Sequence, residues 1–276
     1  MSSLFRDDLL KGKVALVTGG GTGIGAAIAR ELASIGATVV IASRKEQSVR
    51  PAAEHMGVHW KVCDIRDRER VTEVCAGIVD DHGSFDILVN NGGGQFFSPA
   101  EMIRPKGFDA VVGTNLTGTW NMIRGAADAW MLKHGGRIIN ITMLSQRGFT
   151  GMAHSVAARG GVEAMTKTLA VEWANRDVLV NCIAPGYIGS SGLKRYPVEL
   201  GILQMIKTVV PLKRLGTRNE IAWMAAYLAS PAGAYITGQT VTIDGGKELW
   251  GDLWPISDPP GMGPAVPELD PWEEGG

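Results

Sequence analysis

A cluster of glycines is the first part of the chain whose residue types and spacing point to chemistry. It runs from Gly19 to Gly25, after the apolar stretch 14–18 and before an alanine-rich stretch that begins at Ala26. A strand, a tight turn and a helix in this order are the context in which glycines bind a dinucleotide. Glycine lets the backbone approach a pyrophosphate, and the helix N-terminus offers free N–H groups and the positive end of a dipole. The predicted contacts are Gly19, Gly21, Thr22, Gly23, Ile24 and Gly25.

A basic turn follows the second apolar stretch, residues 38–43, and bears on the choice of cofactor. Sites for NAD usually place an acidic residue here to bind the ribose 2′-hydroxyl. This turn has no acid before Glu46 and carries Ser43, Arg44 and Lys45 instead. A guanidinium can bind a 2′-phosphate through two parallel hydrogen bonds, and a serine hydroxyl can donate another. The turn therefore predicts NADPH or NADP+ as the cofactor, and the alternative is a solvated basic turn.

Seven apolar stretches of strand length alternate with helical patterns. The predicted strands are 14–18, 38–43, 58–64, 85–90, 136–141, 178–183 and 239–244, and the predicted helices are 26–33, 67–81, 99–112, 116–133, 154–174 and 219–230. The alternation implies parallel pairing through right-handed crossovers, and almost wholly apolar strands fit a sheet that helices cover on both faces. The predicted fold is an α/β domain over residues 1–249, with a single Rossmann-type doubly wound parallel sheet of seven strands. Its ligands belong outside the carboxyl ends of the strands.

The composition favours a soluble globular protein. The 276 residues carry a formal net charge of −1 and are 45% hydrophobic, which argues against a nucleic-acid partner and an anionic membrane surface. No run of about 18 apolar residues is present to cross a bilayer, and the first residues lack the apolar stretch of a secretory signal. The three cysteines and five histidines show no paired spacing of metal ligands, so no metal site is predicted. Residues 250–276 are rich in proline and glycine, which predicts a C-terminal tail that is extended or docks its tryptophans on a protein surface.

Several motifs together resemble the short-chain dehydrogenase/reductase family. They are Thr18-Gly19-x-x-x-Gly23-x-Gly25, Asn90-Asn91-Gly92-Gly93, Asn115, Pro185-Gly186, Ile236-Thr237-Gly238-Gln239 and Asp244-Gly245-Gly246. The resemblance spans roughly residues 10–248 and implies strand order 3-2-1-4-5-6-7, a nicotinamide cofactor and a homotetramer or dimer. It implies further cofactor contacts after the strands, namely Asp64, Ile65, Asn91, Gly92, Gly93, Pro185, Gly186, Ile188 and Ser190. From the residues alone, Asp64 either meets the adenine edge or caps the next helix.

One segment departs from the pattern of the wider family. Where the family has Tyr-x-x-x-Lys, this chain has Ser155 and Arg159. The family's usual catalytic serine falls near Thr142-Met143. Ser155 and Arg159 are spaced i and i+4, so they lie on one face of a helix. The resemblance implies that Arg159 binds the nicotinamide ribose and supplies positive charge.

Three functions remain open. Residues 90–101, 115–119 and 154–162 are similar, within the family, to the peroxisomal trans-2-enoyl-CoA reductases, which implies NADPH-dependent reduction of the C=C bond of a trans-2-enoyl-CoA. In that reaction negative charge develops on the thioester oxygen, and the Ser155 hydroxyl can donate a hydrogen bond to it. Reduction of a ketone or a 3-ketoacyl group needs an acid for the alkoxide, and serine is a poor acid. The third function is that of a non-catalytic nucleotide-binding member of the family.

The remaining candidates concern the substrate, for which a small-molecule acyl thioester is expected. The predicted catalytic residues are Ser155, Arg159, Asn115, Ser145 and Tyr187; the alternatives are a solvated loop hydroxyl for Ser145 and plain packing for Tyr187. An acyl pocket is predicted from Phe96, Phe97, Met143, Leu144, Ile188, Leu193 and Tyr196, with core packing as the alternative for each. Contacts with a coenzyme A phosphate are predicted from Arg104, Lys106, Lys194 and Arg195, with a solvated surface as the alternative. The last residues, Glu273–Gly276, form no peroxisomal address, so a cytoplasmic location is expected.

Overall fold

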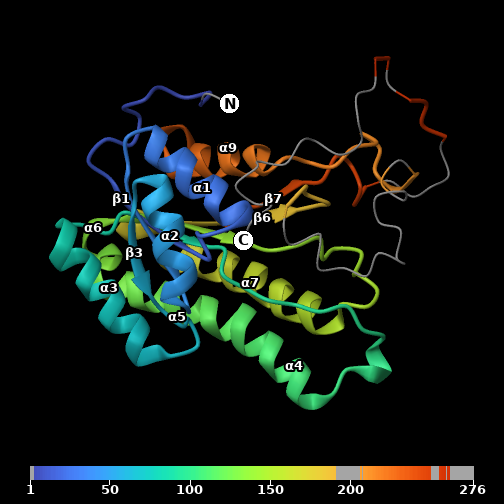
Figure 1. Ribbon diagram of the computed structural model, residues 1–276, viewed down its shortest axis with the longest axis horizontal. Coiled ribbons are helices and arrows are strands. Elements are labelled where there is room, and N and C mark those ends of the chain that lie inside the picture. The colour runs from blue at the N-terminus through green and yellow to red at the C-terminus, as the bar shows by residue number, and fades with distance from the viewer. Residues whose placement is uncertain (1–2, 191–205, 207, 250–254, 259, 262–276) are drawn as a thin grey trace.

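The computed structural model describes residues 3–190, 206, 208–249, 255–258 and 260–261. Within these residues, seven strands form one parallel sheet in the order β3-β2-β1-β4-β5-β6-β7 (Figure 1). The strands are β1 (Val14–Thr18), β2 (Thr38–Ser43), β3 (His59–Val62), β4 (Ile87–Asn90), β5 (Gly136–Ile141), β6 (Val178–Pro185) and β7 (Thr240–Ile243). The predicted fold class and the strand order implied by the family resemblance are confirmed.

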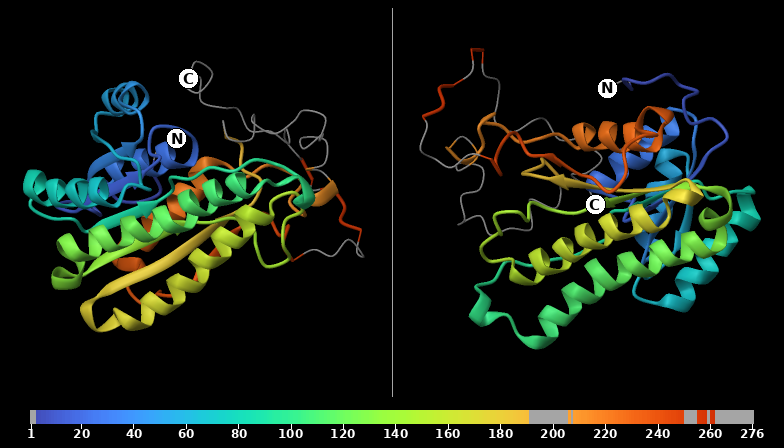
Figure 2. Two further views of the ribbon diagram at one scale, coloured as in Figure 1. Left: turned by 90° about the horizontal axis from the view of Figure 1, so that it is seen from below. Right: turned by 180° about the vertical axis from the view of Figure 1, so that it is seen from behind.

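Helices cover both faces of the sheet, as Figure 2 shows for α9 and α7 on opposite sides. One face carries α1 (Gly23–Ser34), α2 (Glu46–Met56) and α9 (Arg218–Ala229), and the other carries α3 (Arg68–His82), α5 (Gly118–Ala126) and α7 (Ala153–Glu172). Neighbouring residues of one strand point to opposite faces, so Val17 packs in the first core and Leu16 in the second. Both cores are apolar, which explains why the strands are nearly continuous apolar runs in the sequence.

Residues 105–134, between β4 and β5, form one long helical segment where the sequence predicted two helices. It comprises α4 (Pro105–Val112), a π turn (Gly113–Thr117), α5, a second π turn (Ala127–Met131) and α6 (Leu132–His134). Gly113 keeps right-handed helical angles (φ −57°, ψ −38°), so this glycine does not interrupt the helix. The predicted start at Pro99 is wrong, because Ala100–Met102 forms a separate 3-10 turn. The first π turn carries Asn115, in keeping with the frequent place of such turns at functional sites.

Helix α2 lies between β2 and β3, where no element was predicted. It contains Pro51, and a proline inside a helix removes one N–H donor and crowds the preceding turn. The residue pattern of this stretch is therefore a poor helix signal. Val49, Ala52 and Ala53 are nevertheless buried in the core beside α1, so tertiary packing stabilises the helix against the local preference.

The ends of several strands differ from the prediction. β3 and β4 are shorter than expected, and β6 extends two residues further, to Pro185. Pro185 pairs with Ile243 of β7, and the next N–H, that of Gly186, donates to the Ile243 carbonyl at 2.9 Å. Because N–H groups alternate in direction along a strand, position 185 faces β5, whose pairing with β6 has already ended at Ile141. The absent N–H of the proline therefore breaks no ladder bond.

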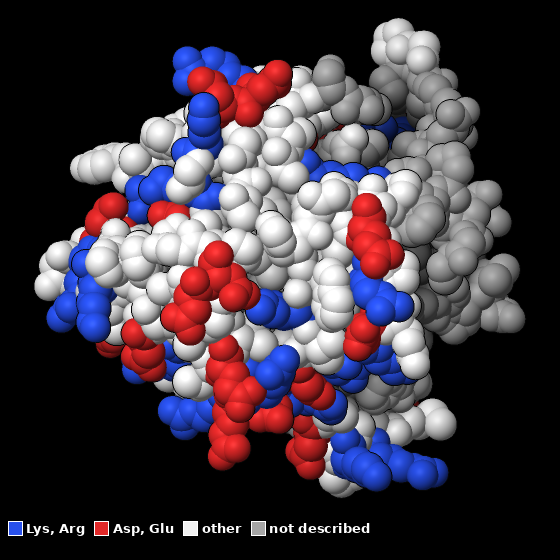
Figure 3. All heavy atoms as spheres, turned by 60° about the vertical axis from the view of Figure 1, so that its left-hand side comes forward, with Lys and Arg blue, Asp and Glu red and all other residues white. Residues whose placement is uncertain are grey.

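The surface carries both signs of charge. On the face seen in Figure 3, acidic and basic side chains are interspersed. Among the described residues no helix is long and apolar enough to cross a membrane. The predicted tail, residues 250–276, lies largely outside the described residues. In the described part of it, Asp258 accepts a hydrogen bond from Lys213 Nζ at 2.9 Å.

Candidate active site

The glycine turn between β1 and α1 is fixed from the neighbouring strand. Asn91, directly after β4, donates through Nδ2 to the carbonyls of Thr18 and Gly19 at 3.1 Å each. Thr18 Oγ1 in turn accepts from the N–H groups of Asn91 at 3.1 Å and Gly92 at 2.9 Å. A Cβ on Gly25 would overlap both the Gly19 carbonyl oxygen and the Asn91 side chain. The close approach of these backbones therefore requires glycine at position 25.

The N-terminus of α1 opens beside this turn. Thr22 precedes the helix without capping it through its side chain, and the first turn, which includes Gly23 and Ile24, contains no acidic residue. A phosphate at this end would meet backbone N–H groups and the positive end of the helix dipole. Gly21 is less constrained than Gly25, because a Cβ there would make only an ordinary 3.6 Å contact with Ala52. The turn and the helix N-terminus thus have the shape and polarity that a dinucleotide phosphate requires.

The basic turn lies at the carboxyl end of β2. Arg44 is exposed and makes no hydrogen bond to the described residues, while the neighbouring Ser43 Oγ makes only a long bond, 3.4 Å, to the Lys45 carbonyl. Arg66 hydrogen-bonds the Asp64 carboxylate through its backbone N–H (3.0 Å) and Nε (2.9 Å), which lowers the pKa of Asp64, and the charge of Arg44 lowers that pKa further. Among the described residues, the guanidinium donors of Arg44 are thus unoccupied, as contact with a 2′-phosphate would require.

Asp64 and Ile65 follow β3 as expected, but Asp64 is bound by Arg66 and Ile65 is buried. The cap of α3 is Asp67, whose side chain accepts from the Arg70 N–H at 3.0 Å, whereas Asp64 forms the turn before it by accepting from the Arg66 N–H at 3.0 Å. An adenine contact of Asp64 would share oxygens already bound by Arg66. Ile65 is buried, and a Cβ on Gly118 would lie 2.6 Å from its Cγ1.

We expect the Arg44→Ala variant to bind NADPH roughly tenfold or more weakly, with unchanged NADH affinity. A charge-assisted hydrogen bond to the 2′-phosphate contributes about 1.5–3 kcal/mol, and NADH lacks that phosphate. Titration of both cofactors by fluorescence measures the two affinities. Arg50→Ala is the matched control, because Arg50 is an exposed arginine of α2 that pairs with Glu46 and Glu54 instead. Equal losses for both cofactors would show that Arg44 does not bind the phosphate.

Ser155 lies buried in the first turns of α7. Its Oγ is 2.7 Å from Gln95 Oε1, to which it donates a hydrogen bond. If the Gln95 amide turns over, its Nε2 donates to the serine and the hydroxyl proton is released to a ligand. Gln95 was not among the predicted site residues, although it lies in the stretch 90–101 that carries the family resemblance. The structure makes it the hydrogen-bond partner of Ser155.

Arg159 lies one turn further along α7, and its guanidinium is buried. Nη1 donates to the carbonyl of Ile141, the last residue of β5, at 2.8 Å. Burial lowers the pKa of Arg159 to about 10, so the group is still charged at neutral pH. Among the described residues no carboxylate pairs with it. A buried positive charge without a counter-ion is suited to a polar or anionic ligand.

Gly93 and Asn115 meet at this guanidinium. A Cβ on Gly93 would overlap Arg159 Nη2 and lie 2.8 Å from Asn115 Oδ1. Asn115 holds the same loop through both atoms of its amide: Oδ1 accepts from the Gly94 N–H at 2.9 Å and Nδ2 donates to the Gly94 carbonyl at 3.0 Å. The structure thus brings together predicted residues from the loop after β4, the π turn and α7.

Ser145, in the loop after β5, is engaged by an acid that the sequence did not indicate. Its Oγ donates to Glu163 Oε2 at 3.0 Å, and Thr142 Oγ1 donates to Oε1 of the same carboxylate at 3.0 Å. Burial raises the pKa of Glu163, and the negative charge of Glu248 raises it further. Glu163 follows Arg159 by four residues, so its spacing on the Ser155 face of the helix was the available signal.

The segment after β6 is close to β7. The backbone of Gly186 packs on Asp244, and a Cβ on Gly186 would lie 2.7 Å from Asp244 Cα. Tyr187 is half-buried, with its ring centroid 6.2 Å from that of Phe149. The Ile188 side chain is buried in the core, as the packing alternative for this residue expects. Ser190 is half-buried at the last described position before the gap.

The apolar residues predicted to meet the acyl chain divide into three sets. Phe96 and Phe97 are 42% and 39% exposed in the loop next to Gln95. The Phe96 ring packs edge-on against the buried His154 ring at 4.3 Å. Met143 is half-buried and Leu144 is buried. Leu193 and Tyr196, like Lys194 and Arg195, lie outside the described residues, whereas Arg104 and Lys106 are exposed at the start of α4.

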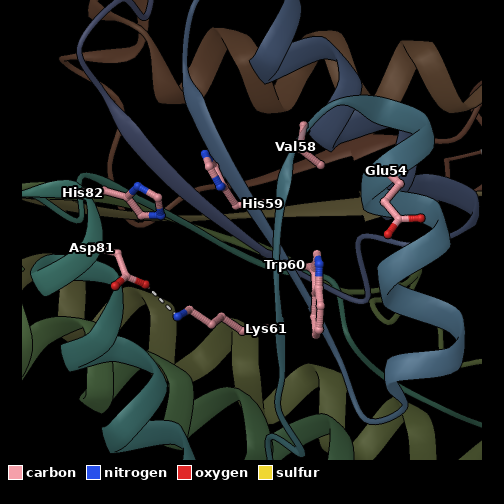
Figure 4. Close-up of a pocket in the computed structure, with 7 residues that line it drawn as sticks. All are labelled: Glu54, Val58, His59, Trp60, Lys61, Asp81 and His82. Atoms are coloured by element: carbon pink, nitrogen blue, oxygen red, sulfur yellow. Dashed lines mark hydrogen bonds and ion pairs between the residues drawn. The ribbon is translucent and has the colours of Figure 1, made fainter.

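A surface hollow of about 450 Å³ lies elsewhere, beside edge strand β3 (Figure 4). Its lining is Glu54, Val58, His59, Trp60, Lys61, Asp81 and His82. Lys61 forms an ion pair with Asp81 at 2.7 Å, and the rings of His59 and His82 are 4.6 Å apart. His59 begins β3 and His82 ends α3, so the hollow is at the amino end of the strand. It is therefore separate from the cradle at the carboxyl ends.

Comparisons with known proteins agree with this geometry. A family model described as Enoyl-(Acyl carrier protein) reductase matches residues 19–248. A peroxisomal 2,4-dienoyl-CoA reductase ((3E)-enoyl-CoA-producing) of Pongo abelii is 39% identical over 254 residues, 89% of this chain and 87% of that protein. The 3-oxoacyl-(acyl-carrier-protein) reductase FabG of Vibrio cholerae is 37% identical over 243 residues, 87% and 99% of the two chains. The solved structure of a citronellol catabolism dehydrogenase (AtuB) from Pseudomonas aeruginosa PAO1 is similar with a TM-score of 0.81 and 39% identity, covering 90% of this chain and all of that one. The chain belongs to the short-chain dehydrogenase/reductase family of nicotinamide-dependent oxidoreductases.

Proposed function

We propose that the protein uses NADPH to reduce a C=C bond conjugated to an acyl-CoA thioester. The observation that carries this proposal is the pair formed by Ser155 and Gln95, joined at 2.7 Å where the family's common acid, a tyrosine, is absent. A serine hydroxyl and an amide are hydrogen-bond donors, but neither is an acid near neutral pH. Such donors suit a thioester oxygen that becomes an enolate, which needs stabilisation and no immediate proton.

Each residue of the site has a separate role in the proposed reaction. The bound nicotinamide supplies the hydride that adds to the substrate. Arg159 binds the ribose beside it and places a positive charge next to the reacting groups, and Asn115 keeps the loop at Gly94 in the position that leaves room for that guanidinium. Ser155, with Gln95, donates to the thioester oxygen. Ser145 and Tyr187 are the candidates for the proton that must reach the carbon skeleton afterwards.

The proposed substrate is a 2-enoyl or a 2,4-dienoyl thioester. The relatives named 2,4-dienoyl-CoA reductases, from Pongo abelii and from Bacillus subtilis at 35% identity, support a conjugated acyl-CoA. A second double bond spreads the negative charge over more carbons, while the thioester oxygen still carries much of it. The same two donors therefore serve both substrates. Exposed Phe96 and Phe97 offer an apolar wall, and Arg104 and Lys106 offer positive charge for a coenzyme A phosphate.

Ketone reduction is the second candidate. It is favoured by the similarity to 3-oxoacyl-(acyl-carrier-protein) reductases, at 37% identity over nearly the whole of those chains. The geometry opposes it, because an alkoxide needs an acid at the position that Ser155 occupies.

The ranking of substrates tests the proposal directly. We expect faster NADPH oxidation with crotonyl-CoA or 2,4-hexadienoyl-CoA than with acetoacetyl-CoA, measured from the absorbance of NADPH at equal substrate concentrations. The comparison of the first two substrates decides between the enoyl and the dienoyl thioester. Faster turnover of acetoacetyl-CoA would reject the proposal in favour of ketone reduction. NADPH binding without turnover of any of the three would indicate a non-catalytic member of the family.

We also propose that the chain assembles with copies of itself, as a homotetramer or dimer, and works in the cytoplasm. The family resemblance supports the assembly. Analytical ultracentrifugation measures the mass in solution, and a monomer at micromolar concentration would contradict it.

A further inference from the structure

The face of α7 that carries Ser155 and Arg159 continues to Glu163 in the next turn. Arg159 donates to the carbonyl at the end of β5, and Glu163 accepts from the two hydroxyls that follow, those of Thr142 and Ser145. The two residues therefore hold consecutive parts of one loop. Of these two residues, Glu163 carries the carboxyl group that can pass a proton to a hydroxyl, and burial raises the pKa of that carboxyl.

The hydrogen bonds of this carboxylate control the direction of the Ser145 proton. A hydroxyl has a single proton and two acceptor lone pairs. When Glu163 is ionised, the Ser145 proton points to it, and the Thr142 proton points either to it or to the Ile183 carbonyl at 3.3 Å. Neither hydroxyl then donates to a substrate. When Glu163 is protonated on Oε2, it donates to Ser145 Oγ instead. The Ser145 proton is then free to point into the site.

A second carboxylate, that of Glu248, holds the same loop. Glu248 Oε1 accepts from the N–H of Gln146, the residue after Ser145, at 2.7 Å. The position of Glu248 is set by Asp244, whose Oδ2 accepts from the Glu248 N–H at 2.6 Å. Two acids from distant parts of the chain thus accept hydrogen bonds from the loop after β5.

These surroundings favour the protonated form of Glu163. Burial raises its pKa most, and the charge of Glu248 raises it further. The hydrogen bonds from Thr142 and Ser145 and the charge of Lys167 act in the opposite direction. Cys182 also faces this carboxylate, and its own pKa, raised to about 11, leaves it uncharged at neutral pH. The net effect is a raised pKa for Glu163 on a side chain that is only half-buried and so can exchange protons with solvent.

We propose that Glu163 is the positioning residue that directs and reloads the Ser145 proton for the protonation step. This inference rests on the proposed function. As the enolate collapses, the Ser145 O–H bond breaks and its proton forms a C–H bond at the α-carbon, or at the terminal carbon of a dienolate. The Glu163 proton moves to Ser145 Oγ, and the carboxylate left behind takes a proton from solvent. One hydride and one proton are thus added to the substrate, as the reduction requires.

The Glu163→Gln variant tests this proposal through the pH profile of kcat. We expect the wild-type kcat to fall as pH rises through the pKa of Glu163, because only the protonated carboxyl reloads the serine. The glutamine keeps a donor and an acceptor of the same shape but has no transferable proton. The kcat of this variant should be lower by about 10²-fold and should not fall as pH rises. Its KM and its NADPH affinity should be unchanged. Glu172→Gln, an exposed acid at the end of the same helix, is the matched control and should behave as wild type.

A second variant and a measurement without turnover strengthen the test. Glu248→Gln keeps the acceptor for Gln146 but removes a like charge, so the fall in kcat should shift to lower pH. In the protein without cofactor, the raised pKa means that the folded state binds the Glu163 proton more tightly than the unfolded state. Its contribution to stability is complete below the ordinary pKa of 4.5 and is lost as pH rises through the folded value. The Tm of wild type should therefore fall across that range relative to Glu163→Gln.

The outcomes separate this inference from the proposed function. A wild-type fall in kcat that persists in Glu163→Gln, or a variant altered only in KM, would overturn the role of Glu163. If Glu163→Gln does not fold, the Glu248→Gln variant decides instead. An unshifted pH profile of kcat in that variant would overturn the role of Glu163. Rejection of the proposed function shows only in the ranking of crotonyl-CoA, 2,4-hexadienoyl-CoA and acetoacetyl-CoA by wild type, whereas the Tm comparison needs no substrate.

Discussion

Ser155→Ala should lower kcat for an enoyl-CoA or dienoyl-CoA by roughly 10²–10³-fold, with little change in KM or in NADPH affinity. The hydroxyl is buried beside Gln95, where its hydrogen bond to the thioester oxygen strengthens as charge develops there. An interaction made mainly in the transition state affects kcat and kcat/KM together. Steady-state kinetics with a titration of NADPH separate the three quantities.

Two further variants make this result specific. Gln95→Glu places an acceptor without donors next to Ser155, so it holds the hydroxyl proton away from the substrate and should lower kcat as well. Thr168→Ala removes a hydroxyl from the exposed side of the same helix and should leave kcat unchanged. Ser155→Tyr restores the family's residue type, but its ring occupies the space of the thioester, so enoyl reduction should be lost with little gain in ketone reduction. Full enoyl-CoA activity of Ser155→Ala would direct attention to Ser145 or Tyr187.

Arg159→Met should weaken NADPH binding by roughly tenfold or more and slow turnover. The guanidinium supplies charge-assisted hydrogen bonds, each of which contributes about 1.5–3 kcal/mol. The substitution also removes a buried charge that no described carboxylate neutralises, and it leaves the Ile141 carbonyl without its donor. These two effects on folding oppose each other, so a small change in Tm is expected beside a large functional loss. Cofactor titration and thermal unfolding measure the two changes.

Two further variants separate the effect of the Arg159 charge from the effect of the space that its guanidinium needs. Arg159→Lys retains a positive charge without the planar fork and should lose less affinity than Arg159→Met. Gly93→Ala leaves the arginine in the sequence but places a Cβ where Nη2 lies, so it should displace the guanidinium and weaken NADPH binding as well. An unchanged NADPH affinity in Arg159→Met would remove Arg159 from the cofactor site.

The sequence by itself determined the features that depend on neighbours along the chain. The alternation of apolar stretches and helical patterns predicted the doubly wound sheet, because burial on both faces demands continuous apolar strands. The glycine turn was also predictable, because its strand, turn and helix are adjacent in sequence. Local patterns also misled in two places. Pro51 lies in a helix that packing stabilises and that was not predicted, and the two helices predicted as 99–112 and 116–133 are joined by a π turn.

The tertiary structure alone decided which side chains meet. Ser155 was predictable as a candidate, but its partner Gln95 lies 60 positions earlier and reaches it only because β4 and β5 are adjacent in the sheet. Glu248 reaches the loop after β5 across 102 positions, because β5, β6 and β7 end at the same edge. Hydrogen bonds act over about 3 Å, whereas sequence patterns describe periodicity along one element. The contacts that direct protons in this site are therefore a property of the folded sheet.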